Sequence, residues 1–511
     1  YNGVGLEAGN RVTNLMTNTF LEYIRNFGDV HNMEAMIGHS FEKFVERSSF
    51  IRGTDFPNEN FQYLVSAATI TDAEASYFEK RTNSYFGRLK YNYDNRYLIT
   101  FTARYDGSSQ FGPHNQYGFV PAVSVGWRIS EEAFFNVNAI SDFKFRASYG
   151  LTGNDGIPAF SYQALYAGGA NYNTEPGIRP SQLPNPDLKW ETTSQLNFGL
   201  DLGFLKDRII FNADVYAKNT SDLLLDRPIS GTSGYTFITA NIGELQNMGV
   251  EIGITTENIR KDRFSWQSML NYSMNKNKVT RLYNGQPILD VGRGNNSFIE
   301  GEPLSVFYGY VSRGVDPSTG DIVFTDLNGD GEITSDDRTV IGDPNPDFIG
   351  GFNNVLNFGQ FTFSFFMQFS YGNDIFNGSR IYIESLKGED NQLKITEERW
   401  QNPGDRTTIP RATITDPNNN NRESSRFVED GSYLRFKEVS LSYTFKPELL
   451  NRWKLSNLKM YITSRNLFTF TGYSGMDPEV NYAGDDILRM GTDFFTYPQA
   501  RSFIFGISLG I

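Results

Sequence analysis

The chain has 511 residues, among them 28 Tyr, 43 Phe and 48 Gly, and it contains no Cys. The lack of Cys excludes a disulfide framework and thiolate chemistry, and a formal net charge of -13 argues against a nucleic-acid binder, which needs a basic face. The mean hydropathy is -0.43, and the absence of any run of about 18 apolar residues excludes helical membrane spans. Barrel strands are compatible with this composition, because only every second side chain of such a strand faces lipid.

Alternation of apolar and polar side chains begins early in the chain. Between 97 and 105 the odd positions are apolar or aromatic, and the preceding run 85–93 alternates in the same way. The residues between these runs, Asp94-Asn95-Arg96, are predicted to form a tight hairpin. A second pair of runs, 196–204 and 209–216, flanks a second turn at 206–208.

The two faces of these runs differ in chemistry. The polar positions include Arg, Lys, Asp and Asn in mid-strand, as expected for the wet lumen of a barrel, although a soluble β-sandwich would also alternate. Tyr and Phe crowd the tight turns, which is typical of an interfacial girdle; ordinary cross-strand aromatic pairing is the alternative. The side chains expected to face lipid are Tyr97, Ile99, Phe101, Leu196, Phe198, Leu200, Phe503, Phe505 and Ile507.

Extended over the whole chain, the pattern predicts fifteen strands: 18–28, 31–43, 84–93, 96–107, 117–130, 141–152, 190–204, 208–219, 246–257, 263–275, 347–358, 360–371, 431–446, 456–470 and 500–511. Short turns alternate with long loops at 44–83, 108–116, 153–189, 220–245, 276–346, 372–430 and 471–499. Outer-membrane barrels have short periplasmic turns and long extracellular loops. The predicted fold class is therefore all-β, a large antiparallel transmembrane β-barrel.

One further run, 304–315, also has the character of a strand. A spanning strand at this point would break the alternation of short and long connections, so we assign it to the extracellular loop 276–346. In a barrel of about 22 strands with a plugged lumen, the fifteen strands would be roughly the last two thirds.

Residues 326–337 read DLNGDGEITSDD, the pattern of an EF-hand-type calcium loop. The spacing gives oxygen ligands at loop positions 1, 3, 5, 7 and 12, with Gly at position 6 for the sharp turn. Position 12 is Asp where Glu is usual, and the shorter side chain predicts weak binding; a metal-free acidic turn is the alternative. The predicted ligands of a structural Ca²⁺ are Asp326, Asn328, Asp330, the Glu332 carbonyl and Asp337.

No arrangement of residues points to an enzyme. The histidines are His31, His39 and His114, and the sequence places no Ser and acid near any one of them. Asn, Asp, Tyr and Trp of the long loops, for example Trp190 and Trp400, could stack on and hydrogen-bond a sugar or a peptide. Solvated loop is the simpler interpretation for any single residue, and no substrate-binding residue is predicted.

The stretch 461–481, YITSRNLFTFTGYSGMDPEVN, resembles the end of a SusC/RagA-type TonB-dependent outer-membrane transporter. Other stretches are similar to the same family in the same order, although the last residue, Ile511, departs from the Phe or Tyr that usually ends a barrel. These stretches are YDGSSQFG at 105–112, VSVGWRISEEAFF at 123–135, NPDLKWETT at 185–193, NMGVEIG at 247–253, GDPNPDFIGGF at 342–352 and EDGSYLRFKEVSLSYTF at 429–445.

The resemblance implies that residues 1–511 are the C-terminal portion of such a barrel in the outer membrane of a Gram-negative bacterium, with the plug domain and first strands outside this sequence. It implies import of large nutrients, oligosaccharides most often and peptides otherwise, energised by the TonB complex and assisted by a SusD-like surface lipoprotein. Catalysis and nucleic-acid binding are not expected. A non-transporting surface barrel that acts as adhesin or scaffold is the alternative, and a plug domain would distinguish the two.

Overall fold

The computed structural model describes residues 3–158, 160–173, 175–388 and 391–510. Strands make up 57% of it and helices 7%, which confirms the all-β fold class. The chain divides into two compact units. Unit 1 contains Tyr1–Trp127, Arg146–Leu196 and Asn219–Glu244, and unit 2 contains Arg128–Phe145, Asn197–Lys218 and Leu245–Ile511.

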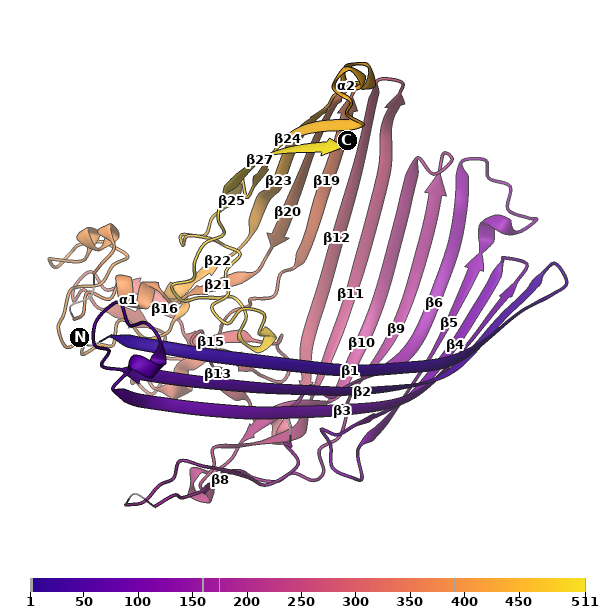
Figure 1. Cartoon of the computed structure of the whole chain (residues 1–511). Helices are drawn as coiled ribbons and strands as arrows, with labels where there is room; N and C mark the ends of the chain where they lie inside the picture. Colours follow the sequence, from indigo (N-terminus) through magenta and orange to yellow (C-terminus); the bar gives the residue numbers. More distant parts are fainter. Residues whose placement is uncertain (1–2, 159, 174, 389–390, 511) are drawn as a thin grey trace. The chain divides into compact units, whose positions relative to one another are not determined.

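The largest sheet has 16 antiparallel strands, including the short β25 (Thr469–Thr471), which pairs with β23. Its other strands follow each other in the sheet in chain order (Figure 1). They are β1 (Val4–Phe27), β2 (His31–Thr54), β3 (Thr69–Tyr93), β4 (Tyr97–Ser108), β5 (Tyr117–Arg128), β6 (Ile140–Asn154), β9 (Glu191–Phe204), β10 (Ile209–Pro228), β11 (Phe237–Lys261), β12 (Phe264–Arg281), β19 (Phe348–Phe358), β20 (Phe361–Tyr371), β23 (Tyr433–Thr444), β24 (Asn457–Arg465) and β27 (Ser502–Gly510).

Each of the fifteen predicted strands corresponds to one of these strands. The predicted hairpin between β3 and β4 is also confirmed, since Asp94 and Asn95 have φ angles of 52° and 53°. Two successive left-handed residues are the signature of a type I′ turn, which matches the twist of the strands it joins. The last predicted strand ended at Ile511, which lies outside the described residues.

Several predicted boundaries are wrong. The first strand begins at Val4 and not at residue 18. The loop 44–83 is much shorter, because β2 continues to Thr54 and β3 begins at Thr69. The loop 220–245 shrinks to 229–236 for the same reason, and the predicted strand 456–470 breaks after Arg465. In the extension of β2, polar side chains occupy both faces at 46–49, so the two-residue period that marks a half-apolar strand is lost there.

The run 304–315 does not join the large sheet. It forms β15 (Val306–Tyr310) and β16 (Ser312–Val315), which belong to two small sheets. This confirms its assignment to the excursion between β12 and β19. Within the described ranges, no helix is long and apolar enough to cross a membrane.

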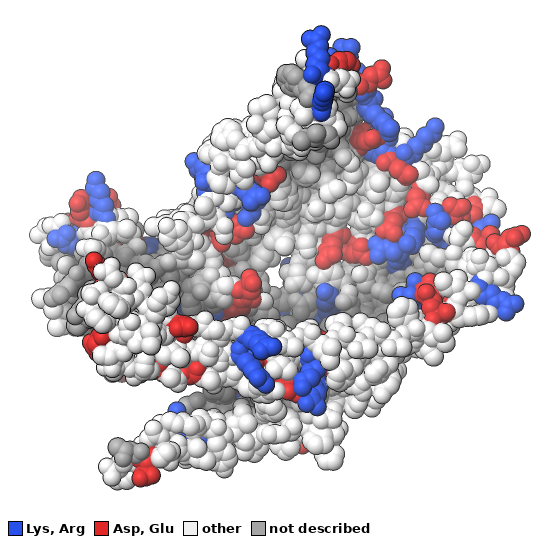
Figure 2. Space-filling view, in the orientation of Figure 1, with Lys and Arg blue, Asp and Glu red and all other residues white. Residues whose placement is uncertain are grey.

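The strand faces have the chemistry that the alternation predicted. In unit 2, Phe361, Phe363, Phe503, Phe505 and Ile507 are all exposed, Phe505 by 77%. Eight of the nine residues predicted to face lipid are exposed, and Leu200 is half-buried. On the face shown in Figure 2, acidic and basic side chains lie in small groups of mixed sign.

Phe198 offers a direct test of this register. It is 46% exposed on the apolar face and its ring stacks on that of Phe145. We expect Phe198→Arg to destabilise the folded protein by about 2–4 kcal/mol if the position lies near the bilayer midplane. Unfolding in lipid vesicles measures this, with Asn197→Arg on the opposite face as the matched control; an equal cost at both positions would contradict the register.

Candidate functional site

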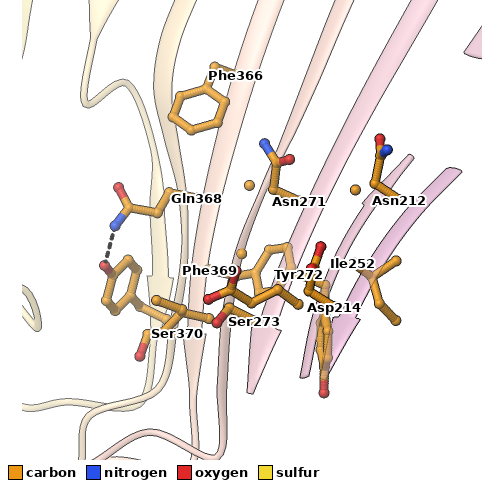
Figure 3. Close-up of a pocket in the computed structure, with 16 residues that line it drawn as sticks. Asn212, Asp214, Ile252, Asn271, Tyr272, Ser273, Phe366, Gln368, Phe369 and Ser370 are labelled. Atoms are coloured by element: carbon orange, nitrogen blue, oxygen red, sulfur yellow. Dashed lines mark hydrogen bonds between the residues drawn. The ribbon is translucent and has the colours of Figure 1, made fainter. Parts of the chain in front are cut away.

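The polar face of unit 2 is hollowed by a recess of about 560 Å³ (Figure 3). Strand pairing places Asn271 of β12 beside Gly351 of β19, and Gly351 beside Gln368 of β20. A Cβ added to Gly253 of β11 would lie 3.8 Å from the Asn271 amide oxygen and 3.9 Å from Cβ of Asn212 on β10. These five residues therefore form one row across five strands, which we call the amide row.

A second row lies two residues further along the strands. It includes Asp214 of β10, Glu251 of β11 and Ser273 of β12, and Ile349 pairs with both Ser273 and Ser370. Figure 3 shows Asp214, Ser273 and Ser370 beside one another, next to the amides. The described residues that line the recess include two carboxylates and no Lys, Arg or His. The recess can therefore bind a ligand through hydrogen bonds.

The side chains of the amide row keep hydrogen-bonding capacity. The Gln368 amide donates to the hydroxyl of Tyr433 at 3.0 Å, and that of Asn212 donates to Asp201 at 3.0 Å. Each of these amides retains an acceptor oxygen, while the side chain of the exposed Asn271 makes no hydrogen bond to another described side chain. The row thus presents donors and acceptors together, which is the pattern that hydroxyl and amide ligands require.

Three long loops of unit 2, namely 282–347, 372–432 and 472–501, fold together into what we call the loop assembly. It contains the sheet β13 (Ile288–Val291), β14 (Asn296–Phe298), β15 and β18 (Arg338–Gly342), and the sheet β22 (Val428–Asp430), β21 (Asp374–Asn377) and β26 (Thr492–Asp493).

The core of the loop assembly joins all three loops. Phe307, Phe376 and Phe427 are fully buried and pack together. The third loop is attached through Asn296, whose buried amide donates to the carbonyl of Met490 at 2.9 Å. The first two loops bury these rings against each other, and the third is attached by this hydrogen bond and by the pairing of β26 with β21.

A buried charge cluster lies beside this core. Arg380 and Arg426 both donate to Glu384, at 2.7 and 3.0 Å, and Arg380 also donates to Glu429 at 2.9 Å. Burial lowers the pKa of Arg426 to about 10, so the guanidinium stays charged at neutral pH. Two arginines facing two carboxylates balance the charge, which limits the cost of burying it.

The terminal loop is fixed to β23 by a second ion cluster that the sequence did not predict. Arg435 donates to Asp477 at 2.5 Å and to Glu479 at 2.7 Å, and Lys437 also pairs with Glu479. The side chains of Arg435 and Asp477 are only 3% and 4% exposed. Arg435 belongs to the stretch 429–445 and the carboxylates to MDPEVN. The stretch 429–445 carries charges of both signs, so its composition does not indicate this pairing, and no spacing rule connects residues so far apart.

The predicted calcium loop brings three of its expected ligands together. Asp330 accepts the Glu332 backbone N–H at 2.8 Å on one oxygen and the Asn328 amide at 2.9 Å on the other. Asp326 accepts the backbone N–H groups of two loop glycines at 2.6 and 2.9 Å. The carboxylate and amide oxygens that suit Ca²⁺ therefore lie within one short loop.

Asp337, the ligand predicted at position 12, is fully buried. It accepts backbone N–H groups of Thr334 and Leu327 at 2.8 and 2.7 Å, and the bond from Thr334 is the main reason that its pKa lies below the usual range. The φ of Gly331 is 88°, so the predicted sharp turn is present. In the part of the chain that the structure describes, no three His, Cys, Asp or Glu side chains form a cluster suited to a metal, and the calcium site stays a prediction.

His31, His39, Trp190 and Trp400 all have structural partners. His31 hydrogen-bonds the hydroxyl of Tyr91 at 2.7 Å, and His39 the side chain of Asn83 at 2.7 Å. Trp190 donates its indole N–H to the Gln116 carbonyl at 3.0 Å. The indole of Trp400 donates to a backbone carbonyl in the same manner, at 2.9 Å. The two histidine contacts join the neighbouring strands β2 and β3, and the two tryptophan contacts attach loop residues.

Comparison with known proteins gives a consistent result. Residues 2–306 match the family described as TonB dependent receptor-like, beta-barrel. TonB-dependent receptor P3 of Formosa agariphila is 35% identical over 99% of this chain and 53% of its own length, and the TonB-dependent receptor SusC of Bacteroides thetaiotaomicron is 32% identical over 97% and 50%. The chain thus spans about half the length of these curated relatives.

A solved structure described as the RagAB peptide transporter has a TM-score of 0.89 and 24% identity, covering 99% of this chain and 56% of that one. This match supports the fold. Proteins of the matched family are receptors and transporters of the Gram-negative outer membrane, not enzymes. The chain therefore belongs to the TonB-dependent receptor β-barrels, and within them to the SusC/RagA type.

Proposed function

We propose that this protein takes part in the import of large nutrients across the outer membrane, energised by the TonB complex and assisted by a SusD-like surface lipoprotein. The observation that carries the proposal is the family match over residues 2–306. The recess supports it, because a polar hollow on a sheet whose other face is apolar suits a wall between lipid and a hydrated path. The long loops then face the cell exterior.

Oligosaccharides are the cargo that the recess favours. Amides and carboxylates can engage the hydroxyl groups of a sugar chain in pairs, and Phe366 and Tyr433 add aromatic surface to the lining. Peptides are the second candidate, because the RagAB structure, which shares the fold, is described as a peptide transporter.

Uptake by intact cells tests the proposal. Cells that carry the protein should accumulate a fluorescent oligosaccharide, and deletion of either this gene or tonB should abolish accumulation. The full-length protein should also co-purify with a surface lipoprotein. Surface binding of glycan that persists without TonB, with no accumulation inside the outer membrane, would instead support the adhesin or scaffold alternative.

We also propose that the loop 326–337 holds one structural Ca²⁺, with Asp326, Asn328, Asp330, the Glu332 carbonyl and Asp337 as its ligands. The support is the EF-hand spacing together with the oxygen-rich donor set. Three carboxylates within one loop repel one another at short range, and a cation would relieve that repulsion. The ion would order the loop, with four side chains and the backbone carbonyl of Glu332 as its protein ligands.

Asp330→Ala tests the calcium proposal. The variant should bind Ca²⁺ at least about tenfold more weakly, because affinity in such loops follows the number of charged oxygen ligands. Asp336→Ala removes the same charge from an exposed neighbour that is not a predicted ligand, and it should bind as the unaltered protein does. Calorimetry and metal analysis of the full-length protein measure both; no bound ion at millimolar calcium would show that the loop is only an acidic turn.

A further inference from the structure

The amide row has a regular composition across the strands. In sheet order it reads Asn212, Gly253, Asn271, Gly351 and Gln368, so amides alternate with glycines. Adjacent strands lie about 4.8 Å apart, which spaces the amides at roughly 9–10 Å. Each glycine therefore leaves a bay between two side chains that can both donate and accept hydrogen bonds.

The two bays differ in their surroundings. A Cβ added at Gly253 would meet nothing closer than 3.8 Å, so this bay is open. At Gly351 the added Cβ would lie 2.7 Å from the ring of Phe366, so that ring covers the glycine and gives the second bay an aromatic wall. A ligand lying along the row would meet amides, one open floor and one aromatic surface.

The charges around the row have one sign. Glu251 and Asp214 lie beside it, and none of the described lining residues is basic. Arg435 pairs with Gln368 in the strand register, but its guanidinium is 3% exposed and is already engaged by Asp477 and Glu479. An anionic ligand would therefore meet the carboxylate of Glu251 in a lining without basic residues, and such like-charge contacts oppose binding.

We propose that the amide row is a cargo subsite that binds an uncharged, hydroxyl-rich saccharide segment and rejects anionic saccharides. The Gly253 bay accommodates the segment, the amides hydrogen-bond its hydroxyl groups, and Glu251 repels carboxylated or sulfated chains. The subsite deepens the proposed import function and rests on it, but its binding does not require transport.

Binding by the purified full-length protein tests the subsite separately from uptake. The probes are neutral gluco-, manno- and xylo-oligosaccharides, oligogalacturonate of matched length, and an uncharged Ser/Gly peptide. We expect binding to a neutral oligosaccharide and none to oligogalacturonate. Gly253→Leu should weaken neutral binding roughly tenfold, about the loss of one or two hydrogen bonds, whereas Gly253→Ala fits the space and should change it little.

Charge reversal supplies the second arm. Glu251→Lys should allow oligogalacturonate to bind, whereas Asp262→Lys, the same charge change at the turn between β11 and β12, should not. The proposal is overturned if no neutral oligosaccharide binds, if oligogalacturonate or the peptide binds better, or if Gly253→Leu lowers the melting temperature without affecting probe binding. That last result would mean that the recess packs against another part of the protein. None of these outcomes bears on TonB-dependent uptake, which is measured in cells.

Discussion

Arg435→Ala is expected to lower the free energy of unfolding by about 3–5 kcal/mol, the cost of removing one partner from a buried ion pair. Asp477 would keep a charge that is 4% exposed and has lost its guanidinium, although it would still accept the backbone N–H groups of Glu479 and Gln499 at 2.9 and 2.8 Å. The terminal loop should detach from β23 before the sheet itself unfolds, because these contacts join the loop to the strand.

Hydrogen exchange of residues 472–500 and thermal unfolding in detergent measure this effect. Arg465→Ala is the matched control: its pair with Glu438 spans 3.8 Å and both side chains are about half exposed or more, so its loss should cost less than about 1 kcal/mol. A double variant, Arg435→Met with Asp477→Leu, should be less destabilised than Arg435→Ala, since no buried charge is left unpaired. Equal exchange rates in Arg435→Ala and the unaltered protein would mean that the cluster does not hold the loop.

Phe376→Ala is expected to destabilise the loop assembly by about 3–5 kcal/mol, the usual cost of truncating a buried Phe. Its ring is fully buried, 5.8 Å from the ring of Phe307 and 6.4 Å from that of Phe427. These rings come from two of the three loops, and β21, which carries Phe376, pairs with β26 of the third loop. The cavity left by the missing ring should therefore loosen all three loops together.

Limited proteolysis distinguishes this outcome from a local change. New cleavage sites should occur in 282–347, 372–432 and 472–501 at the same protease concentration, while the strands of the large sheet stay protected. Phe61→Ala removes the same atoms from a ring that is 52% exposed in a loop of unit 1, and it should shift stability by less than about 0.5 kcal/mol. Cleavage confined to the loop that carries Phe376 would show that the three loops fold independently.

Local chemistry was sufficient to predict the strands and their turns. Alternation located each of the fifteen long strands, and Asp94-Asn95-Arg96 predicted a tight hairpin, since both signals depend on neighbours within a few residues. The predictions lost accuracy at 44–54 and 69–83, where β2 and β3 continue with polar side chains on both faces. There the strands are held by backbone hydrogen bonds to their neighbours in the sheet. Because no apolar period accompanies these bonds, the sequence pattern does not reveal the strands.

The sequence alone also determined the family, because its motifs are contiguous, and it proposed the calcium loop from spacing within twelve residues. Only the tertiary structure decided how distant residues combine. The pairing of Arg435 with Asp477, the joint core of Phe307, Phe376 and Phe427, and the amide row each require contacts between segments far apart in the chain. Which residues share a row depends on strand register, and a shift of one residue would turn every side chain of a strand to the opposite face.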